Sequence, residues 1–348
     1  MVSTSGVAKT GPGILMGTRG SSKTSASGSF YQKETRLIEI DDQENIYSVS
    51  FLVDGKRIVG GGRRGKIRCW RVEDGREVGT PMDAGSAVCS VAVSQDGKWV
   101  VSGAESGWVT VWNAENHSKA TRFKGHRNAV RAVDVSPDGT QIATGSEDKT
   151  VCVWSLSTGK RLLDLSQHAD SVVAVKFSPD GRLIAIATRV TSIRIYDSQN
   201  GRLIVVSPIK VNSASNQSFA WASDNKQLFV SSRDSIIHCF DVFNGRTLCQ
   251  WPTDCRGNAS AQCIALASNG TFIATSTLSS LSFWDTTTHE KINCVINHTP
   301  LITTMALSSN NDLVTAGGNE ITIHDLHNVL PSSYCDDVSA FASEREMA

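Results

Sequence analysis

The segment of this chain that most resembles a phosphate-binding loop lies close to the N-terminus. Residues 17–24 read GTRGSSKT, and glycines at such spacing can let backbone N–H groups wrap a nucleotide phosphate. Ser22 stands where such a loop requires its second glycine. No strand pattern precedes the segment and no helix pattern follows it, so the sequence predicts no nucleotide-binding site here.

Histidines, cysteines and carboxylates are the other residues that could bind a metal or catalyse a reaction. The eight histidines do not fall at metal-ligand spacing, and the nine cysteines form neither a Cys-x-x-Cys pair nor a Cys/His cluster. Asp96, Asp138 and Asp180 recur every 42 residues in turn-like sequences, where aspartate is favoured by its local hydrogen bonds. Because no catalytic triad or carboxylate pair stands out from this periodic background, we expect a protein that is not an enzyme and that uses no metal or cofactor.

Composition argues against several classes of partner. Lys and Arg together number 34, as do Asp and Glu, so no net field draws the chain to nucleic acid or to an anionic membrane. No window approaches the roughly 18 to 20 apolar residues of a membrane helix, and the N-terminus lacks the apolar core of a signal peptide. The sequence therefore predicts an intracellular protein, cytoplasmic or nuclear, whose cysteines are reduced and pack as small apolar residues.

The elements that position these residues repeat along the chain. Residues 125–165 contain four short runs of alternating apolar residues, bounded by turn residues, at 130–135, 141–144, 151–154 and 161–165. The sequence SPDG at 136–139 suits a tight turn, since glycine tolerates a positive φ. The turn glycine recurs as Gly55, Gly97, Gly139 and Gly181. Four such runs predict one four-stranded antiparallel sheet.

The end of the third run recurs seven times. Its copies are CWR at 69–71, VWN at 111–113, VWS at 153–155, IYD at 195–197, CFD at 239–241, FWD at 283–285 and IHD at 323–325. Together with the Gly-His start at 125–126, this pattern resembles the WD repeat, whose period is near 40 to 45 residues. The resemblance covers about residues 35 to 328 and implies an all-β fold, a seven-bladed β-propeller of four-stranded antiparallel sheets.

A ring of sheets must also close. The last repeat ends near Leu326 with three strand patterns, whereas residues 35–40 carry a fourth-strand pattern before the first complete repeat. We therefore expect the N-terminal strand to complete the seventh sheet, which is the closure found in the family and which removes open edges. On either side of a propeller at 35–328, residues 1–34 are expected to be a disordered tail rich in Ser, Gly and Lys, and residues 329–348 a flexible C-terminal extension.

The resemblance also implies a buried, hydrogen-bonded tetrad of side chains within a repeat. The third repeat matches all four positions, with His126, Thr144, Asp148 and Trp154. The remaining repeats are incomplete, retaining for example Ser102 and Trp112 in the second, His168 in the fourth and Asp234 in the fifth. We expect the third repeat to be the best anchored, and the other six to depend more on apolar packing between sheets.

Repeat position further implies which side chains face the narrow top of the propeller. In the family these are the third and fifth residues after the starting histidine and the residue before the tetrad aspartate. The register places there Tyr47, Arg63, Glu105, Arg131, Glu147, Arg189 and Arg233, accompanied by residues such as Asn45, Cys89, Ala129 and Leu301. Four arginines outnumber two glutamates, so either these are ordinary solvated side chains or the top binds an acidic or phosphorylated peptide segment that enters over Tyr47 and Arg131.

The resemblance implies a rigid propeller whose loops bind other proteins, a scaffold or adaptor that is itself monomeric within a larger complex. One alternative is a sensor or regulatory propeller related to a larger nucleotide-driven signalling protein, since fungal and plant chains often join WD repeats to such ATPases. A more remote alternative is an enzyme that uses the central channel. It would need acid, base or metal ligands that do not recur with the repeat.

Overall fold

Each repeat folds into a four-stranded antiparallel sheet, because its apolar residues alternate along short strands that pack against a neighbouring sheet. The computed structural model describes residues 35–40, 44–165, 168–189, 192–205, 209–210, 219–231, 235–253, 263–277, 279–297 and 301–335. All described residues lie in one compact unit, Lys33–Ala348.

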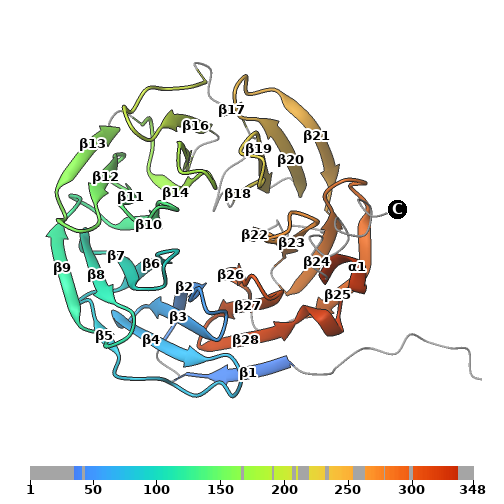
Figure 1. Cartoon of the computed structure of the whole chain (residues 1–348), viewed down its shortest axis with the longest axis horizontal. Helices are drawn as coiled ribbons and strands as arrows, with labels where there is room; N and C mark the ends of the chain where they lie inside the picture. Colours follow the sequence, from blue (N-terminus) through green and yellow to red (C-terminus); the bar gives the residue numbers. More distant parts are fainter. Residues whose placement is uncertain are drawn as a thin grey trace, which may run out of the picture. The chain divides into compact units, whose positions relative to one another are not determined.

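Seven sheets follow one another along the chain, and we call them blades one to seven (Figure 1). Blade one contains β2 (Ile46–Phe51), β3 (Arg57–Gly62), β4 (Lys66–Arg71) and β5 (Met82–Asp83). Blade two contains β6 (Val88–Val93), β7 (Trp99–Ala104), β8 (Trp108–Asn113) and β9 (Lys119–Lys124). Blade three contains β10 (Val130–Val135), β11 (Gln141–Ser146), β12 (Val151–Ser155) and β13 (Arg161–Leu165). Blade four contains β14 (Val172–Phe177), β15 (Leu183–Thr188), β16 (Ser192–Asp197) and β17 (Ile209–Lys210).

The last three blades follow the same order from the inner to the outer strand. Blade five contains β18 (Phe219–Trp221), β19 (Gln227–Ser231), β20 (Ile236–Asp241) and β21 (Thr247–Pro252). Blade six contains β22 (Cys263–Leu266), β23 (Phe272–Ser276), β24 (Ser280–Asp285) and β25 (Lys291–Asn297). Blade seven contains β26 (Thr304–Leu307), β27 (Asp312–Gly317), β28 (Glu320–Asp325) and, as its outer strand, β1 (Thr35–Glu39).

The pairing of β1 with β28 confirms that the N-terminal strand completes the last sheet. The two strands are antiparallel over five residue pairs, with Leu37 opposite Thr322. Seven apolar clusters then join each blade to the next, and the one between blades seven and one contains Val314 and Ile321 together with Ile46 and Val49. The seven-bladed propeller predicted from the repeats is therefore confirmed, with its core lying between the sheets.

A glycine on the second strand lets adjacent sheets stack closely. A Cβ atom on Gly103 of β7 would lie only 2.6 Å from Cγ1 of Val130 on blade three. The same pair recurs as Gly61 with Val88 and as Gly145 with Val172. Each glycine thus leaves room for the first valine of the next blade, so a larger residue there would separate the sheets.

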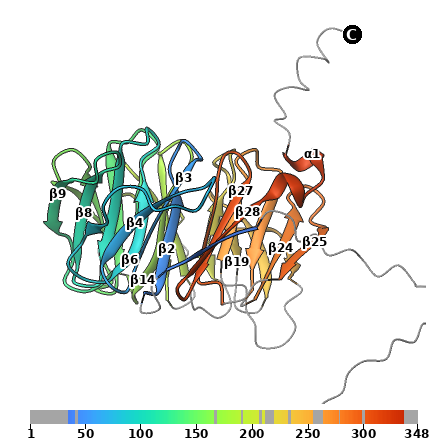
Figure 2. The ribbon, with the colours of Figure 1, turned by 90° about the horizontal axis from the view of Figure 1, so that it is seen from below.

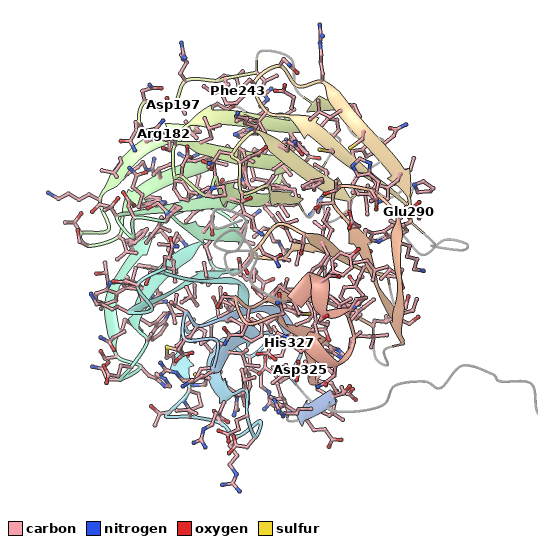
Figure 3. The ribbon with its side chains drawn as sticks, turned by 45° about the vertical axis from the view of Figure 1, so that its right-hand side comes forward. Arg182, Asp197, Phe243, Glu290, Asp325 and His327 are labelled. Atoms are coloured by element: carbon pink, nitrogen blue, oxygen red, sulfur yellow. The ribbon has the colours of Figure 1, made fainter. Side chains whose placement is uncertain are left out.

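Successive strands of each blade run in opposite directions, so the turns between them fall on two opposite faces of the propeller. Figure 2 shows the sheets from the side. We call the top face the one that carries the turns between second and third strands and the links between blades. The bottom face carries the other turns, among them those of Asp197, Phe243 and Glu290, labelled in Figure 3. Gly139, in one bottom turn, has the positive φ of 69° that its turn sequence predicts.

The described part of the C-terminal extension is packed on the sheets rather than loose. After β28 the chain forms the 3-10 helix η1 (Leu326–Asn328) and the short helix α1 (Ser332–Cys335). Leu330 and Cys335 are buried in the cluster between blades six and seven, and the Tyr334 hydroxyl donates a hydrogen bond to Asp285 Oδ2 at 2.8 Å. Both helices are far too short to cross a membrane. Residues 1–34 and 336–348 lie outside the description.

Candidate functional site

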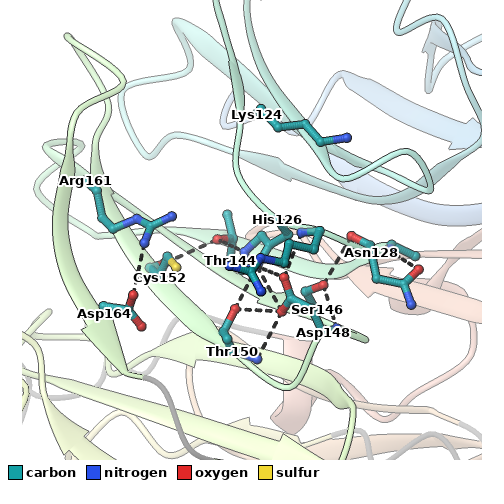
Figure 4. A network of polar contacts seen from close by, with 12 residues as sticks. Lys124, His126, Asn128, Thr144, Ser146, Asp148, Thr150, Cys152, Arg161 and Asp164 are labelled. Atoms are coloured by element: carbon teal, nitrogen blue, oxygen red, sulfur yellow. Dashed lines mark hydrogen bonds and ion pairs between the residues drawn. The ribbon is translucent and has the colours of Figure 1, made fainter.

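The four tetrad residues of blade three form one connected network, of which Figure 4 shows His126, Thr144 and Asp148. The Trp154 indole N–H donates to Thr144 Oγ1 at 2.8 Å, and Thr144 Oγ1 lies 2.7 Å from His126 Nε2. On the other side of the imidazole, Nδ1 lies 3.1 Å from Asp148 Oδ2. A neutral histidine with its proton on Nδ1 satisfies every contact, because Nε2 then accepts the hydroxyl proton of Thr144.

The electrostatics of this network favour a neutral histidine. Burial lowers the pKa of His126 below its ordinary value, and the attraction of Asp148 offsets this only in part. Burial alone would raise the pKa of Asp148, but hydrogen bonds from Thr150, the Arg127 backbone N–H and His126 hold it below its usual value. The His126 side chain is fully buried and that of Asp148 is only 12% exposed, so the pair connects the strands of blade three from within.

Among the described residues, blades two and six contain the tryptophan–hydroxyl part of the same network. In blade two the Trp112 indole N–H donates to Ser102 Oγ at 2.9 Å. In blade six Trp284 donates to Thr275 Oγ1 at 3.0 Å, a pair that sequence reasoning missed because this repeat has no tetrad histidine in register. In blade four His168 is buried beside Tyr196, and burial, with the charge of Arg194, lowers its pKa to about 4.

On the top face the structure brings together three of the residues that repeat position selects. Arg131 is the second residue of β10, and Glu147 follows β11 in the same blade. Arg131 Nη2 lies 2.6 Å from Glu147 Oε1, and Arg189 of blade four reaches the same oxygen at 3.6 Å. Arg131 Nη1 also contacts Cys89 Sγ of blade two at 3.8 Å. This cluster therefore spans three neighbouring blades.

Both arginines of this cluster are accessible to solvent. The side chain of Arg131 is 39% exposed and that of Arg189 is 54% exposed, whereas Glu147 is only 20% exposed. The exposed carboxylate of Glu105 acts on Arg131 only through its charge. The cluster is thus two solvated guanidinium groups oriented by one partly covered carboxylate.

The other residues that repeat position assigns to the top face lie apart from this cluster or outside the residues that the structure describes. Tyr47 and Arg63 belong to blade one and are both exposed. Leu301, 57% exposed, approaches from blade seven, where Thr303 Oγ1 donates to the Ile46 carbonyl at 3.2 Å. Ala129, which the register also assigns to the top surface, is buried and contributes no accessible surface. Arg233 lies outside the described residues.

A second basic surface, which sequence reasoning missed, lies on the rim of blade two. Lys119, Arg122 and Lys124 follow one another along β9, the outer strand. Arg122 stacks 4.6 Å from the centre of the Trp108 ring, and Lys119 lies 5.2 Å from that of Trp112. An outer strand lined with basic residues is the usual protection against edge pairing, so we treat this surface as a reference for the top face.

Metal binding has no support in the described part of the chain, where no group of three His, Cys, Asp or Glu side chains could hold an ion.

Comparison with known proteins adds the family to this geometry. The model described as IFT122 first beta-propeller matches residues 87–332, and the model described as WD domain, G-beta repeat matches residues 35–71. The solved structure of U3-55K superposes with a TM-score of 0.75 at 19% identity, covering 85% of this chain and 98% of that one. The RRP9 WD40 repeats superpose with a TM-score of 0.75 at 20% identity, covering 85% and 97%. At such identity these structures show the fold alone. No curated protein sequence matches the chain.

Proposed function

Because this chain belongs to the WD-repeat β-propeller family, as the match of the IFT122 first beta-propeller model over more than half of it shows, we propose that it is a non-catalytic scaffold. In this proposal its top face binds an acidic or phosphorylated segment of a partner protein. WD-repeat propellers generally serve as platforms for protein interaction. The choice of face and of ligand chemistry is our proposal.

The arrangement around Glu147 supports the choice of ligand. Glu147 holds Arg131 through both Nε and Nη2, at 2.8 and 2.6 Å, which fixes the direction of the guanidinium plane. Arg189 is held only loosely, at 3.6 Å. A phosphate or an aspartate pair brings more negative charge than one glutamate. It can therefore bind Arg189 and the free edge of Arg131 with two parallel hydrogen bonds each.

Two exposed apolar side chains also belong to the top face. Tyr47 is 40% exposed, and Leu301 from blade seven is exposed beside the Thr303–Ile46 contact that joins the two blades. Arg63 begins the turn that follows β3 in blade one, and its backbone N–H donates to the Asn45 carbonyl at 2.9 Å. Exposed aromatic and arginine side chains are the residues that most often contribute binding energy at protein interfaces. We propose that the partner segment extends from the arginine cluster toward Tyr47.

The state of the cysteines supports a proposal for the cellular location. The seven cysteines whose side chains the structure describes are free thiols, at both buried and half-buried sites. Free thiols of this kind persist in reducing compartments. We place the protein inside the cell, in the cytoplasm or the nucleus.

The experiment that tests this function is affinity capture with matched charge changes. The double variant R131E/R189E should lose capture of the main partner while keeping the melting transition of the wild type. The control variant K119E/R122E makes the same change of charge on the rim of blade two and should capture normally. If the rim variant loses capture and the top-face variant retains it, the binding surface lies on the rim.

A further inference from the structure

Two cysteines of blade five face each other across neighbouring strands. In the register of β20 and β21, Cys239 lies directly opposite Cys249. Opposed residues of an antiparallel pair have Cα atoms about 4.5 to 5.5 Å apart and side chains on the same face of the sheet. A disulfide requires a Cα separation of about 4.4 to 6.8 Å, so the backbone already has the spacing of a cross-strand disulfide. The Cys239 thiol also donates a hydrogen bond to Gln227 Oε1 at 3.4 Å.

The two thiols differ in accessibility. Cys239 is buried, within the apolar cluster between blades five and six that contains Trp251 and Trp284. Cys249, on the outer strand, is only partly buried against the same cluster. A small oxidant can therefore reach Cys249 from solvent, while Cys239 is reached only through Cys249. These are the positions of an attacking and a resolving thiol.

A histidine from the neighbouring blade completes the site. His289 lies in the turn between β24 and β25, and its Nε2 is 3.4 Å from Cys249 Sγ. Its ring stacks on Trp251 with centroids 4.6 Å apart and planes 17° apart, which fixes its orientation. The bottom turns that flank the site hold Phe243 and Glu290, both labelled in Figure 3. An imidazole nitrogen at this distance can accept the thiol proton of Cys249.

We propose that Cys239 and Cys249 are a redox-active dithiol, which a hydroperoxide oxidises at Cys249 with His289 as the proton acceptor. In the first step Cys249 sulfur attacks the outer peroxide oxygen, the O–O bond breaks, and the peroxide leaves as an alcohol, or as water from hydrogen peroxide, after taking up a proton. In the second step Cys239 sulfur attacks the Cys249 sulfenic acid, the S–O bond breaks and water leaves. Two thiols are oxidised to one disulfide, and one peroxide is reduced.

The surroundings indicate a slow sensor rather than a rapid peroxidase. Burial holds the pKa of the Cys249 thiol above its ordinary value. Burial also raises the pKa of Cys239, which suits a thiol that waits for its partner to react. Closing the disulfide fixes the outer strand β21 to β20, at the place where His289 and Trp251 connect blades five and six.

Peptide mapping of the oxidised full-length chain tests the proposal. The reduced protein is treated with hydrogen peroxide, its remaining thiols are alkylated, and the digest is analysed by mass spectrometry. We expect one disulfide that links the peptides of Cys239 and Cys249 and that dithiothreitol reverses. C239S should accumulate a sulfenic acid at Cys249 that dimedone traps, and C249S should leave Cys239 reduced.

Two controls keep the result decisive. H289N retains a side chain that tolerates the positive φ of 61° at this position and should slow formation of the disulfide about ten-fold or more, since it removes the proton acceptor. Cys89 is a half-buried thiol with no second cysteine beside it among the described residues, and it reports the background rate in the same digest. If Cys249 is oxidised no faster than Cys89 in the wild-type chain, the proposal of a redox-active dithiol is overturned. This comparison does not depend on the folding of any variant. An unchanged rate in H289N overturns the role of His289.

Discussion

Arg189 of blade four and Glu147 of blade three are joined across the boundary between two blades, with 3.6 Å between Nη2 and Oε1. The same carboxylate holds Arg131 more tightly, so Glu147 already occupies part of what an acidic ligand would use. Because both arginines are accessible to solvent, this internal ion pair is weak and can be exchanged for a ligand. Two accessible arginines that share one carboxylate form a local basic surface on a chain with no net charge.

Removing the internal competitor should strengthen ligand binding. In E147Q the side chain keeps its size but loses its charge, so both arginines become fully available to an added anion. We expect the affinity for a phosphoserine peptide rich in Asp and Glu to rise a few-fold, measured by fluorescence anisotropy at low salt, and the gain to shrink as salt is added. Weaker binding by E147Q would mean that Glu147 is needed to orient Arg131.

Truncation of Trp154 should destabilise the propeller strongly. Trp154→Ala removes a buried ring and leaves the Thr144 hydroxyl without its indole donor, so the free energy of unfolding should fall by roughly 3 to 5 kcal/mol. Phe240→Ala, at the same position of blade five, removes a buried ring that carries no N–H donor and measures the apolar part alone. Chemical denaturation compares the two variants. A neutral Trp154→Ala would remove the structural role of the tetrad.

Asp134 should make stability depend on pH. Burial between the inner strands of blades three and four raises its pKa to about 6, although the Phe177 backbone N–H donates to Oδ2 at 2.7 Å. A folded pKa above the unfolded value means that protonation favours the folded state, so this stability is present below about pH 4 and is lost as pH rises through 6.

D134N removes that titration while keeping an oxygen that accepts the Phe177 N–H. We expect it to exceed the wild type in unfolding free energy at pH 7, by at most about 3 kcal/mol, and to lose the advantage near pH 4. Urea denaturation at the two pH values gives the comparison. Equal destabilisation of D134N at both would show that the ionised carboxylate stabilises the fold.

The strand that closes the ring should be indispensable. Deleting residues 1–34 leaves β1 intact and should leave the melting temperature nearly unchanged. Deleting residues 1–42 removes β1 and exposes the full edge of β28, so the melting temperature should fall and aggregation should increase. Calorimetry and light scattering measure both. Equal behaviour of the two deletions would show that pairing of β1 with β28 contributes little.

The blades could be predicted from sequence because each repeat carries its own alternation of apolar residues and the first four share a turn glycine at a spacing of 42 residues. The His126–Thr144–Trp154 connection follows from repeat position for the same reason. Other contacts depend on distances between strands that no periodic pattern records. The opposition of Cys239 and Cys249, ten residues apart across a hairpin, depends on a bulge after Cys239 that sets the register.

Surface and terminal features were harder to predict for similar reasons. Repeat position assigned Arg131, Glu147 and Arg189 to the top face. It could not predict that one carboxylate holds both arginines, since side-chain conformation and the packing of adjacent blades decide this. The hydrogen bond from Tyr334 to Asp285 joins the end of a repeat to a C-terminal segment outside the repeats, so no periodic pattern predicts it.

Direct binding of a defined peptide tests the central claim, that Arg131 and Arg189 recognise an acidic segment on the top face. The probe is a fluorescent Asp/Glu-rich phosphoserine peptide, compared with its unphosphorylated form and with a scrambled lysine-rich peptide. The wild type and K119E/R122E should bind the acidic peptides in a salt-dependent manner, and R131E/R189E should lose that binding while its melting transition stays at the wild-type temperature. Undiminished binding of the acidic peptides by a folded R131E/R189E would contradict the account.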